Sequence, residues 1–192
     1  KSMIVKSYEC VYGPFCIKIP IGAVTEKALS SSSPSPQFAR AKNTRIAFLD
    51  EPEDDIPMQK GTVKRLTGGD SFFARHLQEN GADIKSTFKL VLVCNKVPIF
   101  ANPDPAIKKR TNILPHFSEW VEDAPTDINE QYAQRKFKMN ILFDKRIPIL
   151  SHAILWIAVM FYPKYLAEGK NYPEIVKQHT ESYWRDNDIY AQ

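Results

Sequence analysis

The chain has 192 residues, of which 43% are hydrophobic and 25% are charged, ordinary values for a folded protein that can bury a core. Wholesale disorder, a collagen-like repeat and a disulfide scaffold are therefore excluded. The 26 basic and 22 acidic side chains leave a net charge of +4, which permits a polyanionic partner without requiring one.

The first predicted elements are a helix and a strand. Residues 3–12 contain no Gly or Pro and favour a helix, which Gly13 and Pro14 end. Residues 15–21 alternate between apolar and other side chains, which is typical of a strand. Pro20 lacks an amide hydrogen, so this strand is expected at the edge of a sheet. The apolar side chains expected on one face are those of Phe15, Ile17, Ile19 and Ile21.

A loop, a second strand and a helix come next. Residues 30–36 read SSSSPSP, which is typical of a flexible loop. Residues 45–50 read RIAFLD, a short apolar run that ends in an acid, as buried parallel strands do. Residues 51–57 predict an acidic turn. Residues 58–66 predict a helix, which the pair Gly68-Gly69 stops.

The middle of the chain predicts a hairpin. Two β-type runs, residues 71–77 and 83–95, flank Asn80-Gly81, which is a strong hairpin signal. The second run continues into a core strand at 90–93. Prolines make the next stretch irregular, apart from a short helix expected at about 104–110.

The last third of the chain changes character. Residues 126–142 favour a polar helix, residues 151–168 a buried helix, and residues 172–184 a helix with Pro at an early position. Strands interleaved with helices up to about residue 117, followed mostly by helices, predict an α/β sheet domain and then a small helical one. The side chains expected on one face of the last helix are those of Ile175, Val176, His179 and Tyr183.

Several classes of feature are not expected. The longest apolar run, residues 153–162, is half the roughly 20 residues that a bilayer span needs, so no membrane-spanning helix is predicted. The chain starts without Met and without a signal peptide, which favours a fragment of a larger protein. Cys10, Cys16 and Cys94 are odd in number and lack CxxC spacing, which favours a reducing compartment. The histidines are scattered singly, so no zinc site is predicted.

The chain opens with Lys1-Ser2, followed by a helix. This order ends a phosphate-binding loop, GxxxxGK[ST], in which the Lys neutralises phosphate charge and the Ser hydroxyl binds Mg²⁺. The glycines of such a loop would lie upstream of Lys1. Any other Lys-Ser pair would look the same, so the pair gains meaning only from the motifs farther along the chain.

Polar side chains end two of the apolar strands. Asp50 ends the first of these, and an Asp there can bind Mg²⁺, while Glu51 beside it can orient and deprotonate an attacking water. Asn95 ends the second, where an amide can hydrogen-bond a γ-phosphate or its water. If the two strands are parallel, their carboxyl ends lie at the same edge of the sheet, where α/β proteins bind ligands. The alternatives are solvated acids in a turn and an Asn that begins a turn.

Basic side chains in two places, Arg110 and the region of the hairpin, are further candidates for binding phosphates. Arg110 could act on the γ-phosphate in a neighbouring subunit, as an arginine finger does. The alternative is a solvated basic cluster, residues 108–110. Near the hairpin, cations could bind a DNA backbone without reading bases, or could simply keep an exposed hairpin soluble. The candidate DNA-binding residues are Lys64, Arg75, His76 and Lys85.

Four segments occur in a fixed order: RIAFLDEPED (45–54), VKRLTGGDSFFAR (63–75), FKLVLVCNKVP (88–98) and DPAIKKRTNILPHF (104–117). They resemble the helicase part of the primase-helicases of large DNA viruses such as poxviruses and asfarviruses. These proteins are superfamily 3 helicases with an AAA+-type P-loop NTPase core. Residues 151–188 resemble the segment that comes after this core.

The resemblance implies roles for individual residues. Lys64 through Arg75 match the additional motif of the superfamily, which lies between Walker B and the sensor. The residues implied to bind ATP are Lys1, Ser2 and Asp50, with Ser2 and Asp50 on Mg²⁺. The implied catalytic residues are Glu51 of Walker B, Asn95 as the sensor and Arg110 as the arginine finger.

The resemblance also implies an assembly and a location. A homo-oligomeric ring, expected to be a hexamer, would hydrolyse ATP between subunits and draw a single DNA strand through its channel, at a cytoplasmic site of viral replication. Residues 1–122 would form the ATPase core, and residues 123–192 a helical lid and the start of a C-terminal domain. Relatives often have Trp-Arg-Arg where this chain has residues 108–110, so the finger is less sharply defined.

Two functions of different classes compete. The first is an ATP-driven DNA-unwinding motor; without the upstream glycines, the 192 residues alone are expected to hydrolyse essentially no ATP. The second is a non-catalytic DNA-binding or ring-scaffolding module, in which Asp50 and Glu51 are solvated turn acids. A third, another AAA+ remodelling ATPase, is disfavoured by the TGGD segment with its adjoining hairpin.

Overall fold

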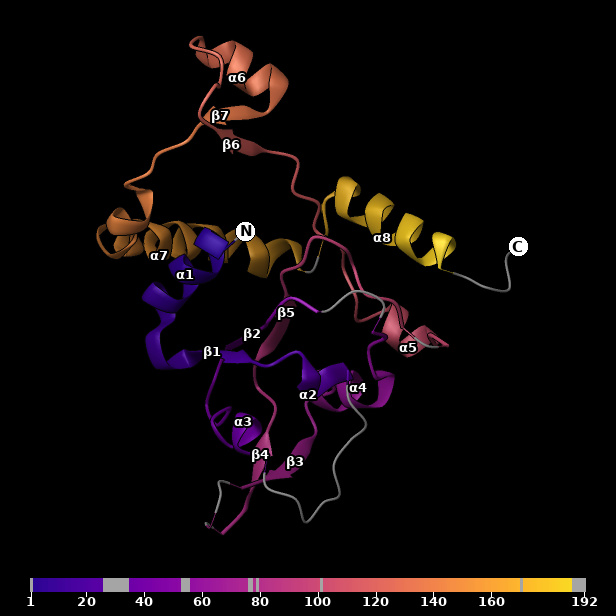
Figure 1. The fold of residues 1–192 in the computed structure, drawn as a ribbon. Coiled ribbons are helices and arrows are strands. Elements are labelled where there is room, and N and C mark those ends of the chain that lie inside the picture. The colour runs from indigo at the N-terminus through magenta and orange to yellow at the C-terminus, as the bar shows by residue number, and fades with distance from the viewer. Residues whose placement is uncertain are drawn as a thin grey trace. The chain divides into compact units, whose positions relative to one another are not determined.

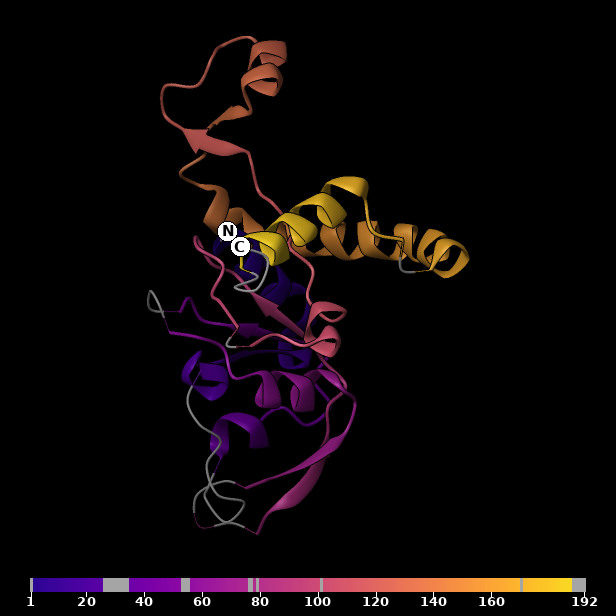
Figure 2. The same cartoon turned by 90° about the vertical axis from the view of Figure 1, so that its right-hand side faces the viewer.

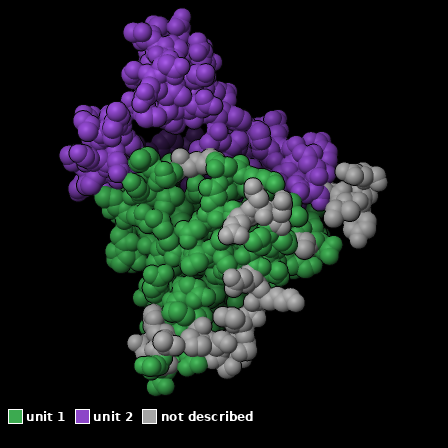
Figure 3. Space-filling model, viewed as in Figure 1, with its two compact units in different colours: residues 1–111 green, residues 112–192 purple. Residues whose placement is uncertain are grey.

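The structure is a computed structural model that describes residues 2–25, 35–52, 56–75, 78, 80–100, 102–169 and 171–187. The chain divides into two compact units, residues 1–111 and 112–192, which Figure 3 distinguishes by colour. The boundary expected after residue 122 stays a prediction.

The first unit contains a three-stranded parallel sheet (Figure 1). Its strands are β1 (Cys16–Ile19), β2 (Ile46–Leu49) and β5 (Lys89–Leu92), in the order β1-β2-β5. The central strand, β2, is fully buried from Ala47 to Leu49, as its continuous apolar run predicts. The predicted α/β class with a parallel sheet is confirmed, and so is the edge position of the strand that precedes Pro20.

Helix α1 (Ser2–Tyr12) covers one face of this sheet. Val5 forms a buried cluster with Cys16 and Phe48, and the Tyr8 ring meets the Phe48 ring edge-on at 5.8 Å between centroids. A 3-10 turn, η1 (Gly13–Phe15), joins the helix to β1. The prediction that Phe15 shares a strand face with Ile17 and Ile19 was wrong, because Phe15 ends this turn and precedes the strand.

Two further helices of this unit come after strand ends. They are α2 (Gly22–Thr25) and α4 (Lys60–Thr67), and the amide of Gln59, just before α4, donates a hydrogen bond to the Val24 carbonyl at 2.7 Å. The predicted helix at 58–66 is confirmed with a start two residues later. Gly69 lies just after it with φ +79°, a conformation that glycine adopts without strain, so the TGGD turn can lead at once into the next strand.

The predicted hairpin is confirmed. Strands β3 (Ser71–Ala74) and β4 (Ala82–Lys85) pair antiparallel, and Figures 1 and 2 both show them projecting from the lower end of the first unit. The short helix α3 (Pro36–Ala39) packs against β3, with the Phe38 and Phe72 rings 5.6 Å apart. The predicted loop at 30–36 lies outside the described residues except for its last two positions, and part of the predicted acidic turn at 51–57 also lies outside them.

The expectation of one continuous β-run over residues 83–95 was wrong. The run divides into β4, which belongs to the hairpin, and β5, which belongs to the parallel sheet. Between them the buried Ser86 hydroxyl donates to the Leu66 carbonyl, and the Thr87 hydroxyl donates to the Thr44 carbonyl at 2.9 Å. These bonds to other segments direct the chain out of one sheet and into the other. Farther along, the predicted short helix is present as α5 (Pro105–Lys108).

The second unit starts with a small parallel pair of strands. These are β6 (Glu119–Val121) and β7 (Lys136–Lys138), with α6 (Ile128–Gln134) between them. The prediction of a helix over 126–142 was therefore only partly right. Arg135 has φ +56° and ends α6, after which the chain forms β7.

Helices α7 (Phe143–Glu168) and α8 (Glu174–Asp186) complete the unit. The prediction that 151–168 is a buried helix was right about the helix and wrong about burial, since Trp156 is 63% exposed. On α8, Val176 is buried as expected, whereas Ile175 is 44% exposed and does not share the inner face. The Thr180 hydroxyl on that face accepts a hydrogen bond from the Ile113 amide at 2.9 Å.

Helix α7 bears on the expectation that no segment spans a membrane. Among the described helices, it alone is long and apolar enough to cross one, by length and composition. The length of the apolar run at residues 153–162 underestimates this helix because Ser151 and His152 interrupt the apolar sequence without ending the helix. One such helix carries little weight, because length and composition do not separate a span from an apolar helix of a soluble protein.

The contact between Gly81 and Phe73 generates the first prediction. A Cβ at Gly81 would lie 1.9 Å from Cζ of Phe73, so Gly81→Ala must displace the ring or the strand end. Because Phe73 is 50% exposed and its ring can turn toward solvent, we expect the hairpin to lose about 1 kcal/mol of local stability, the lower end of the cost of overpacking. Amide hydrogen exchange over residues 71–85 measures this loss. The control is Gly61→Ala in α4, where the added methyl meets open space and should be neutral or stabilising by about 0.5 kcal/mol. Equal exchange in the two variants would contradict the prediction.

Candidate functional site

The ends of β2 and β5 lie side by side. Asp50 and Glu51 come directly after β2, and Asn95 lies three residues beyond β5. The two strands are parallel and in register from Ile46 with Lys89, so both end at the same edge of the sheet. The backbone amide of Asn95 donates a hydrogen bond to Oε1 of Glu51 at 2.8 Å. The structure thus brings together the segments that the sequence predicts to form one site.

This hydrogen bond orients a carboxylate that is otherwise open to solvent. Asp50, Glu51 and Asn95 are all exposed. An amide of one strand end bonded to a carboxylate of the next restricts where that carboxylate can point. The edge therefore presents one positioned acid, one neighbouring acid and one amide side chain, a set suited to binding a hydrated cation and a phosphate.

Ser2 begins α1, and its position is determined by the short turn after that helix. The three residues of η1 join the end of α1 to the start of β1, while Glu9, earlier on α1, forms an ion pair at 3.0 Å with Lys18, later on β1, so the helix runs opposite to the strand. Its first residue therefore lies toward the edge where the parallel strands end. The first amide groups of a helix lack partners within the helix and favour anions. Lys1 lies outside the described residues.

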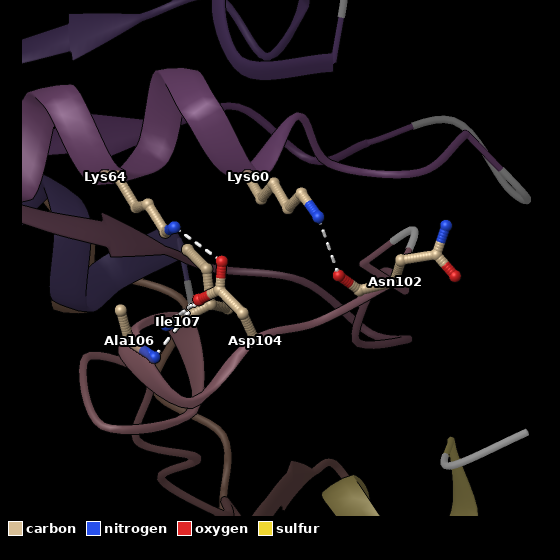
Figure 4. A network of polar contacts seen from close by, with 6 residues as sticks. All are labelled: Lys60, Lys64, Asn102, Asp104, Ala106 and Ile107. Carbon is tan, nitrogen blue, oxygen red and sulfur yellow. Dashed lines mark hydrogen bonds and ion pairs between the residues drawn. The ribbon is translucent and has the colours of Figure 1, made fainter. Parts of the chain in front are cut away.

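Asp104 is the centre of a polar network between α4 and α5 (Figure 4). Its Oδ1 accepts hydrogen bonds from the amides of Ala106 at 3.1 Å and Ile107 at 3.0 Å, which caps α5. Its Oδ2 forms an ion pair with the Lys64 ammonium at 2.5 Å. One turn earlier on α4, the Lys60 ammonium donates to the Asn102 carbonyl at 3.0 Å.

The network changes the properties of two groups. The hydrogen bond from Lys64 and the one from the Ile107 amide lower the pKa of the Asp104 carboxyl below its ordinary value. Lys64, a candidate DNA-binding residue, uses its charge within the protein. Sequence reasoning missed Asp104, although an Asp followed by Pro at the first helical position is an N-cap pattern that the sequence does contain.

The other predicted residues are dispersed over the first unit. The Arg110 amide bonds to the Ile107 carbonyl at 3.0 Å, so Arg110 lies in the turn that ends α5, with an exposed side chain. Lys85 is exposed opposite Ser71 in the hairpin, and Arg75 is half-buried just after β3. His76 lies outside the described residues.

The described residues contain no group of three or more His, Cys, Asp or Glu side chains that could hold a metal ion by themselves. Mg²⁺ needs no such group when it arrives with a nucleotide, because phosphates and waters supply most of its ligands. The Asp50 carboxylate and the Ser2 hydroxyl are donors of the kind that complete this coordination. The three cysteines are free thiols, and burial raises the pKa of the Cys16 thiol.

Comparison with known proteins gives one consistent result. The chain is 27% identical over 99% of its length to "Putative helicase L207/L206" of Acanthamoeba polyphaga mimivirus. It is 30% identical over 96% of its length to "Putative helicase 022R" of Frog virus 3, and 32% identical over 85% to "Putative helicase 184R" of Invertebrate iridescent virus 6. No protein-family model matches the sequence.

These similarities confirm the predicted resemblance to a helicase portion from large DNA viruses. The chain spans about a fifth of the length of the relatives it matches: 20% of the mimivirus protein, 19% of the Frog virus 3 protein and 18% of the Invertebrate iridescent virus 6 protein.

The lowered pKa of Asp104 predicts a pH dependence with a defined sign. A carboxyl whose folded pKa is depressed contributes stability that is fully present above the unfolded-state pKa of about 3.9 and is lost as the pH falls through the folded value. Asp104→Asn keeps a capping oxygen but cannot ionise. The difference in free energy of unfolding between wild type and variant should therefore be largest near neutral pH and vanish in acid. Urea unfolding at pH 7 and at about pH 2 measures it, and a pH-independent difference would contradict the assignment.

Proposed function

We propose that the chain is part of an ATP-dependent DNA helicase of a large DNA virus, with a P-loop NTPase core of the AAA+ superfamily 3 type. The single observation that carries the proposal is the hydrogen bond from the Asn95 amide to the Glu51 carboxylate, which joins the ends of two adjacent parallel strands. The names of the relatives support the same class of activity.

In this proposal Mg²⁺–ATP is the substrate, and the residues at the strand ends have different roles in its hydrolysis. Asp50 and the Ser2 hydroxyl bind the metal ion, and Lys1 neutralises phosphate charge. Glu51 orients the attacking water and accepts its proton, and the Asn95 side chain hydrogen-bonds the γ-phosphate or the water. The backbone amide of Asn95 bonds the Glu51 carboxylate, and the Asn95 side chain would bond the phosphate or the water, so one residue would position both reactants.

The hairpin supplies the proposed contact with DNA. It projects from the first unit (Figure 2). Lys85 on β4 is exposed, and Arg75 comes directly after β3. Cations on a projecting hairpin can follow a phosphate backbone irrespective of base sequence. A homo-oligomeric ring, most simply a hexamer, would place one hairpin from each subunit around a single strand. We propose the reducing cytoplasm as the location, in keeping with cysteines that are odd in number and lack CxxC spacing.

Glu51→Gln in the full-length protein tests the catalytic role. The amide keeps the size of the side chain and can still accept the Asn95 hydrogen bond, but it cannot take a proton. We expect ATP binding within about twofold of wild type and hydrolysis reduced by about 10²–10³-fold. The matched control is Glu181→Gln on α8, an exposed acid in the second unit, which should change neither. Undiminished hydrolysis by Glu51→Gln would favour the non-catalytic DNA-binding or scaffolding module.

Arg110→Ala tests whether hydrolysis occurs between subunits. A finger donated in trans contributes on the order of 10³-fold or more to the rate, so rings of this variant should bind ATP and hydrolyse it very slowly. Mixing Arg110→Ala with Glu51→Gln subunits should restore part of the activity, because some interfaces then pair an intact Glu51 with an intact Arg110. Lys109→Ala is the control for general loss of positive charge. Absence of recovery in mixed rings that assemble normally would refute a trans role for Arg110.

A further inference from the structure

We propose that Lys64 and Asp104 are positioning residues that couple the hairpin to the segment carrying Arg110. The ion pair between them joins α4, which leads into the hairpin, to the cap of α5, which leads into Arg110 (Figure 4). This inference rests on the proposed function for the role of Arg110, whereas the contacts that join α4 to the hairpin and to α5 are observed.

The hairpin is anchored to the last turn of α4 by both of its strands. On the β3 side, the Arg65 guanidinium lies over the Phe72 ring, 6.0 Å from its centroid. On the β4 side, the Ser86 hydroxyl donates to the Leu66 carbonyl. Leu66 itself has no exposed surface. A load on the hairpin is therefore transmitted to the part of α4 from which Lys64 projects.

Helix α5 depends on contacts from outside itself. It has four residues, and a helix this short is not stable by its own hydrogen bonds. It is held by the fully buried Ile107 side chain and by the Asp104 cap, and the same carboxylate binds Lys64. Because the Arg110 amide bonds to the Ile107 carbonyl, the backbone of Arg110 moves with this helix.

Two attachments join α4 to the segment that precedes Arg110. Lys60 and Lys64 are four residues apart, so they lie on one side of α4, and both bind the 102–107 segment. A shift of α4 moves two attachment points of that segment together. DNA held by the hairpin would thus bias where Arg110 points, and so would stimulate hydrolysis in the neighbouring subunit without touching the nucleotide.

Two variants separate this role from direct DNA binding. Lys64→Gln removes the cation, and Asp104→Asn removes the anion while keeping a capping oxygen. The matched control is Lys42→Gln, an exposed lysine in the turn after α3. The test uses the full-length protein and has three measurements. They are amide hydrogen exchange over residues 105–111, affinity for single-stranded DNA without nucleotide, and ATP hydrolysis with and without DNA.

If the ion pair is the coupling element, both variants increase exchange over residues 105–111, keep DNA affinity within about twofold and lose at least tenfold of the DNA-stimulated hydrolysis. The double variant should be no worse than either single one, because both remove the same interaction. Lys42→Gln should match wild type in every measurement.

Three outcomes overturn the proposal. Weaker DNA binding by Lys64→Gln but not by Asp104→Asn would make Lys64 a DNA contact. Unchanged exchange in both variants would remove the mechanical link. Increased exchange with normal DNA stimulation would leave a structural pair without coupling. If instead the proposed function fails, wild type hydrolyses no ATP or Glu51→Gln has no effect, and the exchange measurement still decides whether the link exists.

Discussion

The parallel pairing of β2 with β5 is the constraint on which the rest of the first unit depends. Ile46 aligns with Lys89 and Leu49 with Leu92, so the acids after one strand and the amide after the other reach the same edge. A slip of one residue would turn the side chains of β5 to the opposite face and remove Val91 from the face it shares with Phe48. The buried cluster that α1 builds on Phe48 therefore fixes the register, and the register fixes the site.

The sequence contained enough local information to predict β2, the hairpin and α5. Each has a signal that acts within a few residues: a continuous apolar run, Asn-Gly between β-type segments, and Asp-Pro before a helical turn. The division of residues 83–95 into two strands had no such signal. It depends on Ser86 and Thr87 bonding to carbonyls 20 and 43 residues away, and no local pattern specifies partners at that distance. The short strands β6 and β7 escaped prediction because three residues are too few to show a period.

The candidate site also has features that the sequence predicted and features that it did not. The order of motifs along the chain was sufficient to select Asp50, Glu51 and Asn95, and the parallel sheet then accounts for their proximity. The hydrogen bond between Glu51 and the Asn95 amide was not predictable, because it depends on the path of the backbone after β5. The partner of Lys64 was hidden for the same reason: Asp104 is 40 residues away, and only the packing of α4 near α5 brings the two charges together.

The engagement of Lys64 changes which cations can bind DNA. An ammonium already paired with a carboxylate contributes little to attracting a phosphate, because the pair is nearly neutral at a distance and releasing the ammonium would leave Asp104 unpaired. The net charge of +4 therefore overstates the positive potential at this point of the surface. In the proposed function, direct contacts with the DNA backbone would therefore be made by cations of the hairpin such as Lys85. In the proposed function, the role of Lys64 would then be to maintain the geometry between the hairpin and α5.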